Sequence, residues 1–206
     1  MQADSGDGVE AAGLSARHPD WSRERKSWFE WAPSRSLLAS IRSYQRHGSG
    51  GFWRWLPRMC AIVRHRCWSV VTGADIPLNC KLGGGLSLPH PNGVVIHPDA
   101  QIGPNCLLFQ QVTIGANDRG VPEIGGHVDI GAGAKVLGPI RIGHHARIGA
   151  NAVVMCDVPD GATAVGVPAR VIYRQDEIAR PKGPESGAST YDSSVPGRRE
   201  PGRGPP

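Results

Sequence analysis

Aliphatic residues recur every six positions through the middle of the chain, and this spacing limits the possible folds more than any other feature. Fourteen Ile, Leu and Val residues follow it, in three runs separated by short shifts. The runs are Ile76, Leu82, Leu88 and Val94; Ile96, Ile102, Leu108 and Ile114; and Ile124, Ile130, Val136, Ile142, Ile148 and Val154. A period of six fits neither an amphipathic helix, which repeats about every 3.6 residues, nor a strand that alternates at about every second residue.

This period is typical of a hexapeptide β-helix, in which short parallel strands turn corners around a prism. Each hexapeptide points one aliphatic side chain inward and three make a coil, so stacked positions should lie about 18 residues and about 4.8 Å apart. Glycine follows the aliphatic residue at positions 103, 115, 125, 131, 143 and 149. We expect it to allow corner conformations that a Cβ would oppose. The alternative, a β-sandwich with coincidental spacing, does not account for so regular a series. The ladders leave the handedness open, and the general rule for parallel crossovers favours the right hand.

The composition divides the chain into four zones. Residues 1–33 are polar and punctuated by Gly and Pro, and we expect a loose N-terminal arm. Residues 34–72 are basic and predicted to be helical, and residues 75–172 hold the repeats. Residues 173–206 have almost no apolar side chains, which predicts a disordered tail. The predicted fold is therefore mainly β, a parallel β-helix preceded by a short α-helical segment.

Charge and cysteine content argue against several classes of function. The formal net charge of +5 at pH 7 is weak evidence for nucleic-acid binding, and we expect no nucleic-acid partner. The five cysteines form no C-x-x-C pair, so we expect no metal site. No apolar stretch approaches the length of about 20 residues that spans a bilayer. An odd number of cysteines without a signal peptide favours the cytoplasm.

Several stretches carry a resemblance to a known family: ADIP, GGGLSLPHPNGVVI, QQVTIG, IGAGAKVLGPIRIG, IGANAVV and GVPAR. In these, residues 75–170 resemble the catalytic domain of bacterial serine acetyltransferases, which are left-handed β-helix acyltransferases with hexapeptide repeats. The resemblance covers a little under half of the chain. It implies a left-handed coil, a homotrimer or a multiple of it, and acetyl-CoA bound as co-substrate in clefts between subunits. It also implies a serine O-acetyltransferase activity, which makes O-acetyl-L-serine for cysteine biosynthesis.

Acetyl transfer to an alcohol needs a base for the hydroxyl proton and groups that stabilise negative charge on the thioester oxygen. His90 is the candidate base, because it lies between two prolines in a segment that reads as a turn projecting its side chain outward. Asp75 lies 90 − 75 = 15 residues earlier, nearly one coil below. The family's dyad of Asp and His has this spacing, so the resemblance implies that Asp75 orients the ring. The alternative is a solvated loop histidine and a turn aspartate.

Further candidates surround the predicted cleft. His97 follows Ile96 near the same edge of the coil and could line the substrate site. Arg119 lies in the loop that interrupts the repeats, where the resemblance implies binding of the substrate carboxylate. The resemblance also implies that small residues meet the pantetheine arm and that basic side chains meet the phosphates. The cofactor candidates are Gly133, Ala134, Lys135, Gly149, Ala150 and Arg170, with Arg147 as a further phosphate candidate. Simple surface charge is the alternative for the basic residues.

Two departures from the family leave the acceptor open. Pro89 stands where the family has an Asp that contacts the amino acid, and no histidine follows Arg119 where the family has an Arg-His pair. The alternative enzyme is therefore an O-acetyltransferase of the same fold that acts on a sugar or polysaccharide. The family's partner enzyme docks on a C-terminal tail that typically ends in isoleucine. This chain ends in Gly-Pro-Pro, and we do not expect that complex.

The basic segment, residues 34–72, holds seven arginines and no acidic residue. Leu56, Cys60, Val63 and Cys67 fall at helical spacing, so we interpret the segment as two helices that pack on the base of the coil with arginines facing water. A basic amphipathic segment with interleaved tryptophans can also lie on an anionic membrane. A non-catalytic or membrane-associated trimeric scaffold is therefore the non-enzyme alternative.

Overall fold

The computed structural model describes residues 14–27, 29–47 and 52–173. Its helices are the 3₁₀-helix η1 (Trp21–Glu24), α1 (Pro33–His47) and α2 (Phe52–Thr72). Its strands are β1 (Lys81–Leu82), β2 (Val95–Ile96), β3 (Gln101–Ile102), β4 (Leu107–Leu108), β5 (Thr113–Gly115), β6 (Glu123–Ile124), β7 (Asp129–Ile130), β8 (Lys135–Leu137), β9 (Arg141–Ile142), β10 (Arg147–Ile148), β11 (Val153–Val154), β12 (Thr163–Gly166) and β13 (Ala169–Ile172). The predicted disordered tail, residues 173–206, lies outside the described residues apart from Tyr173.

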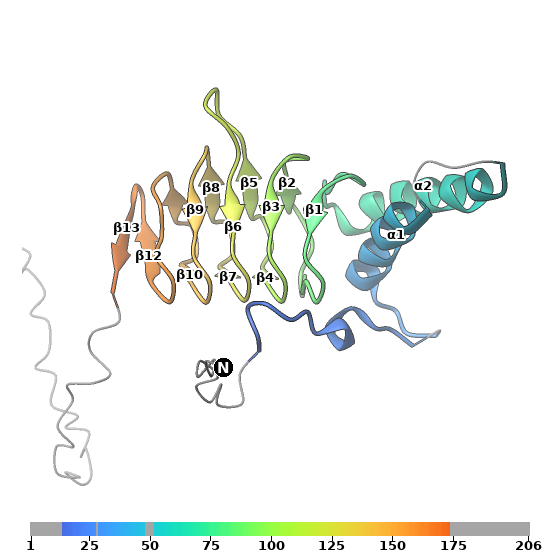
Figure 1. Cartoon of the computed structure of the whole chain (residues 1–206), viewed down its shortest axis with the longest axis horizontal. Coiled ribbons are helices and arrows are strands. Elements are labelled where there is room, and N and C mark those ends of the chain that lie inside the picture. Colours follow the sequence, from blue (N-terminus) through green and yellow to red (C-terminus); the bar gives the residue numbers. More distant parts are fainter. Residues whose placement is uncertain (1–13, 28, 48–51, 174–206) are drawn as a thin grey trace, which may run out of the picture. The chain divides into compact units, whose positions relative to one another are not determined.

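The strands form three parallel sheets that run along the solenoid, and neighbouring strands of a sheet belong to successive coils (Figure 1). One sheet has the order β1-β3-β6-β9, the second β2-β5-β8-β11, and the third β4-β7-β10-β12, whose last strand also pairs with the antiparallel β13. Val136 aligns with Val154, which is 154 − 136 = 18 residues further on. Ile114 aligns with Val136, 136 − 114 = 22 residues on, because the loop after β5 lengthens that coil. The predicted parallel β-helix is confirmed.

The interior of the coils is filled by two ladders rather than one. All fourteen aliphatic residues of the predicted ladders are buried. A second ladder lies two positions earlier in each segment, because alternate residues of a strand face the same side. Val94 belongs to this second ladder, two residues before Ile96. Most of its members have small side chains, among them Val94, Cys106, Val112, Val128, Ala134, Ala146, Ala152 and Ala162, whereas Leu86 and Ile140 are larger.

The glycines that follow the ladder residues have a different role from the one expected. None of these six has a positive φ. A Cβ on Gly103 would lie 2.5 Å from the carbonyl carbon of Gly125, and one on Gly131 would lie 2.6 Å from the amide nitrogen of Ala150. At Gly103, Gly125, Gly131 and Gly143 the backbone of the next coil approaches too closely for a side chain. The expectation of unusual corner conformations is wrong for them. Other residues supply the positive φ, among them Asn105 at 61°.

Helix α1 closes the first coil. It begins at Pro33, a favourable first helical residue because its missing amide hydrogen has no partner there. Leu37, Leu38 and Ile41 are buried in the same cluster as the ladder residues. Arg42 donates hydrogen bonds to two backbone carbonyls of the first coil, at 2.6 Å each. The apolar face of α1 therefore continues the core of the β-helix.

Helix α2 packs on α1 and on the first coil through one face only. Ala61 is buried, and the ring of His65 is hydrogen bonded to the Ile76 carbonyl at 2.8 Å. The predicted packing of Leu56, Cys60, Val63 and Cys67 is wrong, because Leu56 is 62% exposed, Val63 is 58% exposed and both cysteines are exposed. Helical spacing identifies an apolar face but not what covers it. No helix in the described ranges is long and apolar enough to cross a membrane.

Residues 14–27, which we call the strap, lie against the corners of the coils. The expectation was a loose arm over residues 1–33, of which residues 1–13 lie outside the described part. The side-chain amide of buried Asn105 donates to the carbonyls of Ser15 and His18, at 2.6 and 2.8 Å. Its oxygen accepts a bond from the amide of Asp20 at 2.7 Å. The described part of the arm is thus fastened to the β-helix.

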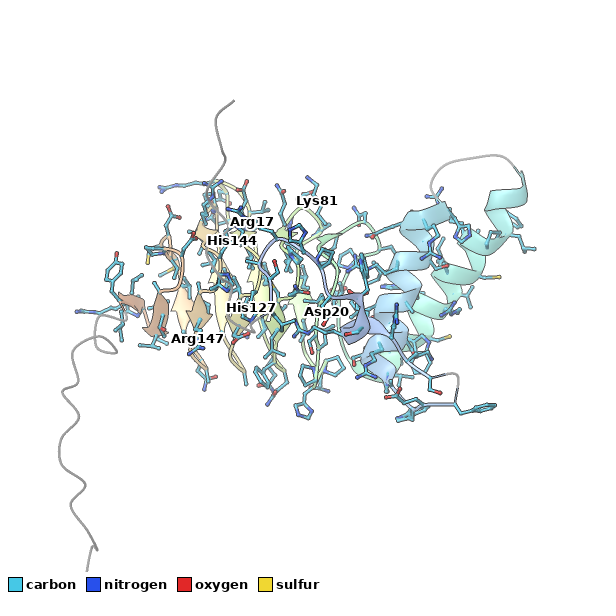
Figure 2. The ribbon with its side chains drawn as sticks, turned by 60° about the horizontal axis from the view of Figure 1, so that its bottom comes forward. Arg17, Asp20, Lys81, His127, His144 and Arg147 are labelled. Atoms are coloured by element: carbon cyan, nitrogen blue, oxygen red, sulfur yellow. The ribbon has the colours of Figure 1, made fainter. Side chains whose placement is uncertain are left out.

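The strap can approach so closely because two coil residues have no side chain. A Cβ on Gly84 would lie 2.6 Å from the ring of Trp21, and one on Gly126 would overlap the carbonyl of Ala16. Figure 2 labels Asp20 of the strap in front of the coils, with His127 further along them. Glycine at these two positions therefore allows the strap to pack directly on the coils.

Candidate active site

The two predicted catalytic residues occupy neighbouring coils. His90 is exposed in the turn that precedes β2, and Asp75 is exposed one coil below. Asp75 is fixed by its backbone, because its amide donates to the Val94 carbonyl at 2.8 Å and its carbonyl accepts from the Ile96 amide at 3.0 Å. No hydrogen bond joins the two side chains in the part of the chain that the structure describes. Catalytic hydrogen bonds often tighten only when substrate binds, so the dyad stays a prediction.

His97 has a close neighbour, Asp99, that the sequence analysis did not single out. Its Nδ1 accepts a hydrogen bond from the Asp99 amide at 3.2 Å and lies 3.8 Å from the Asp99 carboxylate oxygen Oδ2. A ring nitrogen that accepts from an amide carries no proton, so the neutral ring of His97 has its proton on Nε2. The one sequence signal is the position of Asp99, two residues after the histidine.

Arg119 lies at the tip of a tight turn. The backbones of Asn117 and Gly120 exchange two hydrogen bonds at 3.0 and 3.1 Å, and the Asn117 side chain accepts from the Arg119 amide at 2.9 Å. Arg119 borders a cleft of about 400 Å³ with apolar residues that include Leu137 and Met155. His90 does not line this cleft. Within one chain, the cleft therefore does not unite the predicted base with the predicted carboxylate-binding residue.

The predicted cofactor residues share one corner of the coils, apart from Arg170. Gly133 has a φ of 73°, and the next coil passes over it with the Asn151 amide bonded to the Ala132 carbonyl at 2.8 Å. Ala150 is exposed beside Asn151. Small residues on adjacent coils thus line this corner, as an extended ligand would need.

The other members of that set differ in how accessible they are. Ala134 is fully buried, so it shapes the coil from inside. The Lys135 ammonium donates to the Gln111 carbonyl at 2.8 Å, so it lies over the preceding coil. Gly149 has no room for a side chain, because a Cβ would lie 2.7 Å from Cγ1 of Val165. Arg170 is exposed on β13, which contacts β11.

A second cleft adjoins the turn that leads to the candidate base. It has a volume of about 340 Å³ and is lined by Leu88 and Pro89 together with Glu30, Trp31 and Arg35. Glu30 and Arg35 form an ion pair at 3.0 Å, and Trp31 is 77% exposed. The sequence analysis missed these residues. The signal was a concentration of aromatic residues in a segment expected to be loose.

The two buried cysteines, Cys80 and Cys106, do not provide a nucleophile. Burial, reinforced by the charge of the Asp75 carboxylate, raises the pKa of the Cys80 thiol to about 12. Burial also raises the pKa of Cys106 to about 11. Neither thiol is ionised near neutral pH, and the thiolate is the nucleophilic form. No cluster of three or more possible metal-ligating side chains occurs among the described residues.

Curated relatives of this chain are serine acetyltransferases, although no protein-family profile matches it. The enzyme of Synechococcus elongatus is 42% identical over 128 residues, which are 59% of this chain and 52% of the relative. That of Mycobacterium tuberculosis is 40% identical over 126 residues, 58% of this chain and 55% of the relative. That of Helicobacter pylori is 44% identical over 108 residues, 50% of this chain and 63% of the relative. The chain spans about half the length of the curated relatives it matches.

Solved structures of serine acetyltransferases have a fold similar to that of this chain. The soybean serine acetyltransferase apoenzyme has a TM-score of 0.58 and 35% identity, covering 69% of this chain and 58% of the soybean chain. A serine acetyltransferase in complex with CoA and the soybean enzyme complexed with serine give the same values. With its stacked hexapeptide coils, this chain is therefore similar to serine acetyltransferases in both sequence and fold.

Proposed function

We propose that the protein is an acetyl-CoA-dependent O-acetyltransferase whose acceptor is L-serine, acting in the cytoplasm in cysteine biosynthesis. One observation carries the proposal. His90 lies in an exposed turn one coil above Asp75, within a solenoid about 42% identical to a serine acetyltransferase. A histidine and an aspartate on adjacent coils are the groups that deprotonation of an alcohol needs at neutral pH.

In the proposed reaction, Nε2 of His90 takes the proton of the serine hydroxyl as its oxygen attacks the thioester carbonyl. The Asp75 carboxylate accepts the Nδ1 hydrogen and stabilises the imidazolium that forms. The tetrahedral intermediate then expels the CoA sulfur, and the proton held by His90 passes to it. The products are O-acetyl-L-serine and free CoA, and the histidine returns to its neutral state.

We propose further that the active unit is a homotrimer or a multiple of it. Arg119 lines a cleft that does not include His90 of the same chain. A substrate held by both therefore requires residues from two copies, which a cyclic assembly supplies. The corner of Gly133 and Ala150 would receive the pantetheine arm, with Lys135 and Arg170 near the phosphates.

An acceptor screen with the purified full chain tests the proposal. Acetyl-CoA is supplied, release of its thiol is followed, and L-serine and neutral sugars are offered in parallel. Thiol release that depends on L-serine and is lost in His90→Ala supports the proposal. Release with none of the acceptors would refute an acetyltransferase function. Light scattering checks the assembly, and a monomer at micromolar concentration contradicts the shared cleft.

A sugar or polysaccharide acceptor is the second candidate. The cleft beside Pro89 favours it, because an exposed indole face at Trp31 and the polar pair Glu30–Arg35 line it. Small-molecule sites commonly combine aromatic walls with a few polar groups. In the same screen, thiol release with a sugar and none with L-serine would select this function.

A further inference from the structure

Helix α2 carries an apolar face that no described residue covers. Leu56, Met59, Val63 and Val70 are 62%, 39%, 58% and 85% exposed. At about 100° per residue they fall within about 60° of one another around the helix. Buried Ala61 lies on the opposite side of the helix, at about 170° from the centre of this group. The helix is therefore apolar on two sides, of which only one packs against α1.

The edges of this face are cationic. Arg66 lies at one border and Arg64 at the other, and both are exposed. No acidic residue occurs between Pro33 and Ala74. The apolar face is thus bordered by positive charge that no carboxylate of the same helices neutralises.

A basic cleft continues this surface beyond Arg64. It has a volume of about 740 Å³ and is lined by arginines 25, 42, 46 and 64, together with Trp21 and Glu24. Glu24 is engaged with Arg42 at 2.9 Å. Arg25, Arg46 and Arg64 form no ion pair within the described residues. Three exposed cations therefore meet at one hollow beside an exposed apolar stripe.

The charge distribution decides between the possible occupants of this face. A second copy of α2 would bring arginines against arginines, and like charges across an interface are costly. An anionic bilayer offers acyl chains to the apolar stripe and phosphates to the arginines. Basic amphipathic helices lie in the interface of such bilayers for these two reasons. An exposed tryptophan, Trp55, is placed at one end of the face, a residue type enriched at membrane interfaces.

We propose that the exposed face of α2 docks the protein on the surface of an anionic phospholipid bilayer. The helix lies along the surface, with the side chains of Leu56, Met59, Val63 and Val70 in the acyl boundary. Phospholipid phosphates occupy the cleft lined by Arg25, Arg46 and Arg64. Binding to the membrane surface through α2 does not depend on which acyl acceptor the protein uses.

Co-sedimentation of the full chain with vesicles tests the proposal. One vesicle preparation contains phosphatidylcholine with phosphatidylserine, and the other contains phosphatidylcholine alone. We expect binding to the anionic vesicles at least about 10-fold stronger than to the neutral ones, and weaker with added salt. Leu56→Ser/Val63→Ser should weaken anionic binding by about 10-fold or more. Arg64→Gln/Arg66→Gln should also weaken it by about 10-fold or more.

A matched control removes exposed apolar side chains elsewhere. Ile172 and Tyr173 are 54% and 63% exposed at the far end of the β-helix. Ile172→Ser/Tyr173→Ser should leave vesicle binding unchanged. Because all substituted side chains are exposed, thermal melts should match those of the wild type, which excludes unfolding as the cause of weaker binding.

Three results would overturn the proposal. The first is equal binding to both vesicle types. The second is anionic binding that persists in Leu56→Ser/Val63→Ser, which would assign it to another part of the chain. The third is that the wild-type protein binds neither vesicle type and that Leu56→Ser/Val63→Ser reduces the size of the oligomer. That result would show that a second copy of the chain covers the face.

Discussion

Replacing Asn105 by alanine should release the strap from the β-helix. Asn105 is fully buried, and its side chain makes three hydrogen bonds to the strap backbone, at 2.6, 2.7 and 2.8 Å. Its own carbonyl accepts a further bond from Arg23 at 2.6 Å. Asn105 is also at a φ of 61°, a conformation that asparagine tolerates better than alanine. One residue thus holds the strap by three contacts and shapes the corner on which it rests.

The size of the effect follows from these contacts. Each of the three lost bonds contributes about 1 kcal/mol, and an alanine at positive φ costs about 1 kcal/mol more. The total is about 4 kcal/mol, which is the upper limit for the decrease in the free energy of global unfolding. A freed strap regains hydrogen bonds with water, so the loss should appear first as local opening. An opening easier by about 3 kcal/mol accelerates amide exchange by about 100-fold.

Hydrogen exchange of the strap amides is the assay. The Asp20 amide should exchange about 100-fold faster in Asn105→Ala, while amides of the coils beyond β8 keep their wild-type rates. Asn105→Gly is the matched control, since it removes the same bonds without the cost of positive φ. It should show the fast strap exchange but a melting temperature above that of Asn105→Ala. Unchanged exchange at Asp20 in both variants would refute the assignment of Asn105 as the anchor.

Further predictions concern the candidate site and one histidine at the coil corners. His90→Ala should lower kcat by about 10²–10⁴-fold with the assembly intact, and Asp75→Asn by less; retention of more than about a third of kcat would move the base elsewhere. Arg119→Ala should raise KM for L-serine by about 10-fold or more and leave KM for acetyl-CoA unchanged in steady-state kinetics, whereas no change for a serine-active enzyme would contradict its placement. Burial, followed by the charge of His145, lowers the pKa of His127 below 6.5. The native state then binds fewer protons than the unfolded state, so the unfolding free energy should fall as the pH drops below 6.5. Denaturant titrations at two pH values should show a smaller fall in His127→Asn, and an equal fall would contradict this origin.

The β-helix could be predicted from the sequence because its information is local and repeated. Every turn of the prism places an aliphatic residue at the same point, so the ladder from Ile76 to Val154 is legible without knowledge of distant contacts. The second, small-residue ladder carried the same period but was hidden, because alanine and cysteine are not distinctive as core residues. The glycine positions were recognised and their cause was not, since the distance between coils is a property of the stack.

Neither the docking of the strap nor the exposure of the apolar face of α2 could be predicted from the sequence. The contact between Ser15 and Asn105 joins positions 105 − 15 = 90 residues apart, and no repeated sequence pattern indicates it. The spacing of Leu56 and Val63 correctly indicates an apolar helix face, yet the helix has a second apolar face around Ala61. Only the folded structure shows which of the two is covered. The acceptor site could not be identified from the sequence for a related reason: Arg119 and His90 do not line a common cleft within one chain.

The N-terminal residues nevertheless reach the coil that carries the candidate base. Glu24 of the strap accepts a hydrogen bond from the Leu86 amide at 3.1 Å and pairs with Arg42 of α1 through two bonds, at 2.9 and 3.1 Å. The two side chains are only 9% and 15% exposed, so the pair is well shielded from water. Losing either partner would leave a buried charge without compensation, which is far more costly than losing a surface pair. The pair holds the segment from Leu82 to Leu86, because Arg42 also donates to the Leu82 carbonyl, and this segment precedes the turn that carries His90. The strap therefore fixes the start of the segment that leads to the candidate base, although the strap itself lies outside the repeats.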